Sequence, residues 1–153
     1  MIYTPMTHKA MMIAYDAHHG QADKTGIPYI FHPIHLAEQM HDENAVCVAL
    51  LHDVVEDSDV SIEQLREAGF NDDIVTAVEL LTRDPSVSYM DYIEKLSHNP
   101  LAREVKIADL KHNADTTRFK TDIPIHDDER IQSHQRRYIK ALKLLTKDDD
   151  NAE

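Results

Sequence analysis

The scarcity of glycine is the feature that most restricts how this chain can fold. Only 3 of its 153 residues are glycine and 6 are proline, so the sequence offers few of the turns that connect strands. Strict alternation of apolar and polar residues, which is typical of half-buried strands, is also rare. These observations together predict an all-α protein.

Start and stop signals divide the chain into about eight expected helices. The segment from Gly20 to Phe31 contains two glycines and Pro28, and it is expected to form a loop. The expected helices run from a Thr7 cap to about His19, from Pro33 to about Met40, from an Asn44 cap through Val55, from Ser61 to Gly69, from about Asp72 to Thr82, from about Ser88 to His98, from Pro100 through Leu110, and from an Asp127 cap to about Leu145.

The length of the chain fits one domain with a core that needs no disulfide staples. We expect this domain to comprise residues 1–146. Residues 147–153 are polar and acidic and are expected to form a frayed tail.

Charge and composition exclude several classes of function. The formal net charge is −12, so the chain repels a phosphate backbone and is not expected to bind nucleic acid. Its apolar stretches are far shorter than a membrane span, and the N-terminus lacks the apolar region of a signal peptide. The single cysteine, Cys47, excludes a disulfide framework. The cytoplasm is therefore the expected compartment.

Histidine and carboxylate side chains interrupt one strongly apolar run, residues 49–57. If this run is helical, His52 and Glu56 share a face, and Asp53 and Asp57 share a neighbouring face, because residues four apart meet on a helix. Burying such ions without partners costs on the order of several kcal/mol each. A divalent cation offsets that cost, whereas the alternative interpretation places these side chains on a solvated helix face.

A second buried-looking carboxylate strengthens the case for a metal. Asp109 lies in the apolar stretch from Val105 to Leu110, and aspartate is rarely buried without a partner. A mixed set of imidazole and carboxylate ligands is typical of sites for Mn²⁺, Fe²⁺ or Zn²⁺.

The order of a histidine, a His-Asp pair and a distant aspartate resembles the pattern of the HD phosphohydrolase superfamily. Three stretches more closely resemble the hydrolase domain of the RelA/SpoT alarmone enzymes and the small stand-alone alarmone hydrolases. These stretches are Lys24 to Pro33, Leu50 to Asp57, and Ala108 to Asn113. A further family element matches Leu81-Thr82-Arg83.

This resemblance implies a fold, a metal site and a reaction. The fold is a helical bundle, and the residues matching the family's ligands for one Mn²⁺ are His32, His52, Asp53 and Asp109. Glu56 and Asp57 match the pair that positions or activates the attacking water. The implied reaction converts guanosine 3′,5′-bispyrophosphate (ppGpp) into GDP and pyrophosphate.

Substrate contacts are predicted around the same stretches. Lys24 is expected to pair with a phosphate and Thr25 to hydrogen-bond nearby. Asn113 and Thr116 follow Asp109 at helical spacing, so they are expected to extend the pocket wall.

The chain departs from the alarmone enzymes at two positions. The family usually has arginine where this chain has Asp23 and Asp115. Arginine can stack on a purine and pair with phosphate, whereas aspartate does neither and repels an anion. These differences do not affect the metal ligands. They leave open the alternative that the substrate is another nucleotide that carries a phosphate or pyrophosphate.

Three functions therefore remain open from the sequence. The leading hypothesis is an alarmone pyrophosphohydrolase whose partner is a small nucleotide. The second is a nucleotidase or other nucleotide phosphohydrolase on the same scaffold. The third is a non-catalytic sensor of metal or nucleotide, against which the Glu56-Asp57 pair argues. The sequence also leaves a homo-oligomer open.

Overall fold

The structure is a computed structural model that describes residues 1–119 and 129–147. Over these residues it contains nine α-helices, one short 3-10 helix and no strand beyond an isolated bridge between Ala22 and Pro28. The predicted all-α bundle of about eight helices is confirmed. The elements are α1 (Pro5–Ala17), α2 (Phe31–Ala37), α3 (Glu43–Leu51), α4 (Val54–Asp57), α5 (Ile62–Glu67), α6 (Asp72–Leu81), α7 (Tyr89–Ser97), α8 (Pro100–Ala114), η1 (Thr116–Arg118) and α9 (Glu129–Thr146).

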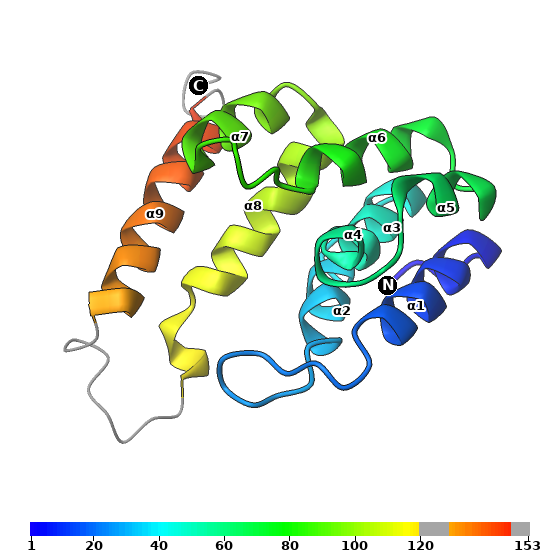
Figure 1. The fold of residues 1–153 in the computed structure, drawn as a ribbon, viewed down its shortest axis with the longest axis horizontal. Coiled ribbons are helices and arrows are strands. Elements are labelled where there is room, and N and C mark those ends of the chain that lie inside the picture. Colours follow the sequence, from blue (N-terminus) through cyan, green and yellow to red (C-terminus); the bar gives the residue numbers. More distant parts are fainter. Residues whose placement is uncertain (120–128, 148–153) are drawn as a thin grey trace.

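Helix α3 forms the centre of the core. All its residues from Ala45 to Leu51 are buried, and it contacts α1, α2, α6 and α8. On the far side of α8, helices α7 and α9 pack against α8 and against each other (Figure 1). None of the helices in the described ranges combines the length and apolar character that crossing a membrane requires.

The structure corrects two of the expected helix caps. Helix α1 begins at Pro5 and is capped by Thr4, because proline suits the first turn and Thr7 completes a capping box with Thr4. Helix α3 is capped by the side chain of Asp42, which accepts from the Ala45 N–H, whereas Asn44 bonds to Asn71. The Asp127 cap expected for the last helix lies outside the described residues, as do tail residues 148–153.

The expected continuous helix through Val55 is wrong at one point that matters for function. Helix α3 ends at Leu51, and α4 begins at Val54. The imidazole of His52 bonds through Nδ1 to the carbonyl of Ala49 at 2.7 Å, and Asp53 has φ −105° and ψ −2°. Consecutive side chains on a regular helix diverge by about 100°. The interruption instead lets His52 and Asp53 converge, with His52 Nε2 lying 2.9 Å from Asp53 Oδ2.

Candidate metal centre

Four side chains from three parts of the bundle converge on one small volume. His32 comes from the first turn of α2, His52 and Asp53 from the interruption between α3 and α4, and Asp109 from the middle of α8. His32 Nε2 lies 3.1 Å from Asp109 Oδ1 and 4.0 Å from Asp53 Oδ2. His52 Nε2 lies 4.0 Å from Asp109 Oδ1. We call these four residues the histidine–aspartate cluster.

The cluster has the spacing and the buried ligand atoms that a shared cation requires. One ligand atom from each of His32, His52 and Asp109 lies within 4.8 Å of the others. Ligand atoms that are each about 2.1 Å from one ion lie roughly 3 to 4 Å apart. The Nε2 atoms of His32 and His52 are buried, and among the described residues neither has a hydrogen-bond partner outside the cluster. The donor set therefore fits a divalent metal.

Hydrogen bonds on the outer side of each imidazole fix which nitrogen faces the cluster. His52 Nδ1–H donates to the Ala49 carbonyl, which leaves the Nε2 lone pair directed inward. His32 Nδ1 lies 2.7 Å from Nδ1 of His112. Burial, together with the nearby His32 and Arg118, lowers the pKa of His112 to about 4. This ring is therefore neutral, and its Nδ1 can accept a hydrogen bond from Nδ1–H of His32. Metal-binding histidines usually have this kind of outer hydrogen bond.

Neighbouring side chains also hold the two carboxylates. Lys106 Nζ contacts Asp109 Oδ2 at 2.7 Å, and the Asn113 amide donates to Asp109 Oδ1 at 2.6 Å. The hydroxyl of Tyr29 donates to Asp53 Oδ2. Each carboxylate is thereby oriented before any ligand binds, which lowers the cost of arranging the site.

The electrostatics of the cluster favour a positive charge at its centre. Burial alone would lower the pKa of His52, but Asp53 and Asp109 together raise it to about 9. Burial would raise the pKa of Asp53, but His52 holds it at about 2. The pKa of Asp109 is likewise well below its usual value, because Lys106 and the two histidines outweigh its burial. Two ionised carboxylates thus attract a cation, whether this is a proton on imidazole or a divalent ion.

Glu56 and Asp57 lie on α4, immediately after the cluster. Glu56 Oε1 accepts from the backbone N–H of Arg83, and the backbone carbonyl of Asp57 accepts from the Gln21 amide at 2.9 Å. Partial burial raises the pKa of both carboxyl groups, and the charge of Asp53 raises them further. A carboxyl group with a raised pKa is better suited to accept a proton at neutral pH than an ordinary surface carboxylate.

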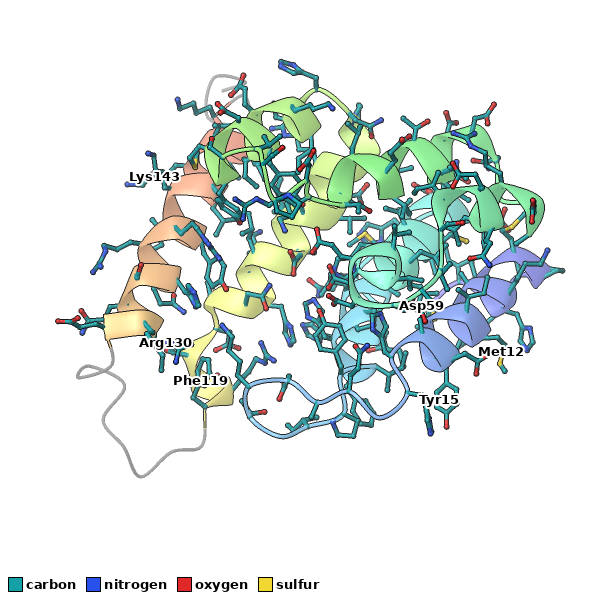
Figure 2. All side chains as sticks on the ribbon, viewed as in Figure 1. Met12, Tyr15, Asp59, Phe119, Arg130 and Lys143 are labelled. Carbon is teal, nitrogen blue, oxygen red and sulfur yellow. The ribbon has the colours of Figure 1, made fainter. Side chains whose placement is uncertain are left out.

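A pocket of about 270 Å³ extends from the cluster toward the loop that follows α1. His32 and Asn113 line it at the cluster end, and Phe119 lies just beyond η1, beside this loop (Figure 2). We call it the loop pocket. Its described lining residues are Ala22, Asp23, Lys24, Thr25, Tyr29, His32, Asn113, Arg118, Phe119 and Tyr138.

Three of the four predicted substrate residues, namely Lys24, Thr25 and Asn113, line the loop pocket. Thr116 begins η1 and is not among the described lining residues. Asp115 is exposed and caps η1 by accepting from the N–H and hydroxyl of Thr117.

Sequence reasoning missed three residues that shape these sites. Tyr29 and Lys106 both lie in or next to the recognised stretches, and Lys106 precedes Asp109 by one helical turn, so spacing alone could have identified it. Arg118 bonds to Asp23 at 3.0 Å although the two residues are 95 positions apart. No local pattern in the sequence indicates that contact.

Comparison with known proteins defines the class. The family model of the HD domain matches residues 10–118, and the chain belongs to this family. The match includes all four residues of the histidine–aspartate cluster and both carboxylates of α4.

More particular relatives carry names from alarmone metabolism. A Synechocystis protein named as a probable guanosine-3′,5′-bis(diphosphate) 3′-pyrophosphohydrolase is 36% identical over 123 residues, which cover 71% of this chain and 16% of that protein. The Haemophilus influenzae guanosine-3′,5′-bis(diphosphate) 3′-pyrophosphohydrolase is 53% identical over 60 residues, covering 37% of this chain and 9% of the relative. The chain thus spans less than a fifth of the length of these relatives.

A solved structure extends the likeness to nearly the whole chain. It is described as a metazoan ortholog of SpoT that hydrolyzes ppGpp and plays a role in starvation responses. It matches with a TM-score of 0.71 and 25% identity, and the match covers 94% of this chain and 88% of that one. The arrangement of helices is therefore similar to that of this SpoT ortholog.

Proposed function

We propose that this chain is a metal-dependent phosphohydrolase that converts ppGpp into GDP and pyrophosphate. The relatives named as 3′-pyrophosphohydrolases and the ppGpp-hydrolysing structural neighbour support this substrate. The single observation that carries the proposal is the pair of buried Nε2 atoms of His32 and His52, which lie 3.1 Å from Asp109 Oδ1 and 2.9 Å from Asp53 Oδ2 at the cluster end of the loop pocket.

In this proposal His32, His52, Asp53 and Asp109 hold one divalent ion, with Mn²⁺ as the expected metal. Imidazole and carboxylate together suit Mn²⁺, and the absence of thiolate ligands disfavours softer ions. A divalent ion at this position supplies Lewis acidity, which makes water more acidic and withdraws charge from a phosphoryl oxygen.

Glu56 accepts the proton of the attacking water in this mechanism, and Asp57 helps to orient that water. The raised pKa of Glu56 and the fixed hydrogen bond from Arg83 support this role. The water oxygen forms a bond to the phosphorus attached to the 3′ oxygen, and the bond between that phosphorus and the 3′ oxygen breaks. The 3′ oxygen takes up a proton, so GDP and pyrophosphate are released.

The loop pocket is the proposed site for the rest of the nucleotide. Lys24 pairs with a phosphate, and Asn113, which is oriented by its bond to Asp109, lies between the pocket and the cluster. The hydroxyl of Thr25, which donates to Asp23, can accept a hydrogen bond from the nucleotide, and Thr116 remains a predicted contact. Proteins bind nucleotides through such combinations of cation and amide donors.

The products released from a panel of nucleotides test the proposal against its alternatives. The purified chain, loaded with Mn²⁺, should release pyrophosphate from ppGpp and no orthophosphate. Orthophosphate release from nucleoside monophosphates would instead favour a nucleotidase. A protein that binds Mn²⁺ and nucleotides but turns over none of the panel would favour the sensor hypothesis and contradict hydrolysis.

The remaining expectations from the sequence form part of the same proposal. The hydrolase domain comprises residues 1–146, and its partner is a small nucleotide rather than nucleic acid or a membrane. A cytoplasmic location stays a prediction, and a homo-oligomer stays open.

A further inference from the structure

The loop pocket contains a positively charged side chain that neither the sequence patterns nor the family resemblance assigns a role. Arg118 lies at the end of η1 and lines the pocket with Lys24. The net charge of the whole chain is −12, so two cations in one pocket stand out against the rest of the protein. Burial, together with nearby Arg137 and Arg130, lowers the pKa of Lys24, which indicates that positive charge concentrates at this end.

Two bonds hold the guanidinium of Arg118 in place. Nη1 donates to the His112 carbonyl at 2.9 Å, and Nη2 donates to Asp23 Oδ2 at 3.0 Å. Over residues 1–119 and 129–147 these are its only hydrogen bonds. Each terminal nitrogen therefore keeps a second N–H, and Nε–H is also available to an incoming acceptor.

Hydrogen bonds from the loop and from Arg118 satisfy the carboxylate of Asp23, so it does not present an unpaired negative charge to the pocket. Its Oδ1 accepts from the N–H of Thr25 at 2.8 Å, from the Thr25 hydroxyl at 2.6 Å and from the N–H of Ile27 at 3.1 Å. Its Oδ2 accepts from Arg118. Only 15% of the Asp23 side chain is exposed. This aspartate therefore shapes the loop and fixes the arginine.

The position of Arg118 within the pocket indicates which part of a substrate it meets. The cluster end of the pocket is lined by His32 and Asn113, where the reacting phosphate must lie if the proposed function is correct. Lys24 belongs to the loop after α1 and Arg118 to η1, and neither is a member of the cluster. A second anionic group on the same nucleotide is the chemistry that suits two cations there.

We propose that Arg118, positioned by Asp23, is a substrate-binding residue that, with Lys24, binds the phosphate group of the nucleotide that is not cleaved. This inference rests on the proposed function, in which the 3′ diphosphate lies at the cluster and the 5′ diphosphate lies in the loop pocket. Asp23 thus holds the guanidinium of Arg118, which comes from η1, in the loop pocket. The pocket therefore contains an arginine although position 23 is an aspartate.

A series of substrates tests the inference. The steady-state constants of the wild type and of the Arg118→Gln variant are measured with guanosine 3′-diphosphates that carry a 5′-diphosphate, a 5′-monophosphate or a 5′-hydroxyl. Arg118→Gln should raise KM about 10-fold or more for the first, less for the second, and less than about 2-fold for the third. An equal change for all three, or no change, would overturn the inference. Partial unfolding lowers kcat for all three alike, so it cannot imitate this pattern.

Arg66→Gln provides a matched control, because Arg66 forms an ion pair of the same 3.0 Å length with Asp72 on the surface, outside the loop pocket. It should leave all three KM values unchanged.

Asp23→Asn distinguishes the two effects that Asp23 could have. If its main effect is to repel the substrate, removal of the charge lowers KM. If it acts by holding Arg118, the same variant raises KM for the 5′-diphosphate substrate, which is the result we expect. A lower KM would overturn the positioning role.

Binding measurements separate failure of this inference from failure of the proposed function. If the wild type releases no pyrophosphate, hydrolysis is contradicted, and calorimetric affinities for the same three nucleotides then test Arg118 alone. An affinity that falls in Arg118→Gln only when a 5′ phosphate is present supports the inference. Affinities that do not depend on Arg118, or no binding, would overturn it.

Discussion

The histidine–aspartate cluster and the loop pocket meet at His32, yet they are built differently. The cluster is supplied by α2, the interruption after α3, and α8, and three of its four side chains are buried. The loop pocket is supplied by the loop between α1 and α2, by η1 and by α9, and its cations are partly exposed. Helices that pack against the core fix the cluster, whereas the loop and η1 supply the two cations of the pocket.

This contrast predicts that the two regions tolerate substitution differently. A change at Asp109 or His52 leaves a buried charge or polar group unpaired, which costs several kcal/mol. The carboxylate of Asp23, in contrast, is satisfied within the loop and by η1, through Thr25, Ile27 and Arg118. Loss of activity should therefore follow changes in the cluster, and altered substrate preference should follow changes in the pocket.

The largest effect is expected from removing a cluster carboxylate. Asp53→Ala should abolish tight Mn²⁺ binding and lower kcat/KM at least about 1000-fold, since the metal contributes several kcal/mol to the transition state. Metal content by mass spectrometry and pyrophosphate release measure the two effects. The exposed Asp59, labelled in Figure 2, provides the control Asp59→Ala, which should retain both properties. Full metal-dependent activity in Asp53→Ala would refute the assignment.

Replacing the proposed base separates chemistry from metal binding. Glu56→Gln should lower kcat about 100-fold or more while Mn²⁺ affinity is retained, because the general base is lost but all four cluster residues remain. Rapid-quench or steady-state release of pyrophosphate, together with a metal titration, provides the measurement. Glu67→Gln on the exposed face of α5 is the control. An unchanged kcat would remove Glu56 from the mechanism.

A smaller effect on the cluster is expected from Lys106, which is not a member of the cluster but contacts Asp109 Oδ2 at 2.7 Å. Lys106→Met should weaken Mn²⁺ binding about 10- to 100-fold, since residues that orient metal ligands usually contribute that much. Calorimetric titration with Mn²⁺ measures the affinity, and the exposed Lys111→Met on the same helix is the control. Equal affinities in the two variants would contradict this role for Lys106.

The smallest effect is expected at Asp115, the second position where the family resemblance led us to expect arginine. Asp115→Asn should change KM for ppGpp less than about 2-fold, because Asp115 is exposed, caps η1 and does not line the described pocket. The exposed cap is also screened by solvent and salt. A marked fall in KM would show that this charge does repel the substrate, as its place in the sequence pattern suggested.

The sequence predicts the fold class and the identity of the cluster residues better than it predicts their geometry. Low glycine content and helix signals indicate the bundle, and the expected start at Ser61 and stop at Gly69 are both observed, since Ser61 caps α5 and Gly69 has a positive φ. Spacing alone could not reveal the break between Leu51 and Val54, because a side chain–carbonyl bond and one residue of irregular backbone create it.

The contact between Asp23 and Arg118 is equally hidden, since it forms only when α8 brings η1 beside the loop after α1. Taken from the sequence alone, Asp23 is an unfavourable negative charge. In the folded chain it is a hydrogen-bonded anchor. The effect of a charged residue on a pocket thus depends on its hydrogen-bond and ion-pair partners, and these can come from distant parts of the sequence.

Anomalous diffraction from crystals of the protein grown with Mn²⁺ tests the central claim most directly. We predict one manganese peak about 2.0 to 2.3 Å from Nε2 of His32, Nε2 of His52 and a carboxylate oxygen of each of Asp53 and Asp109. A peak at any other place, or a saturated crystal with no peak among these four side chains, would contradict the account.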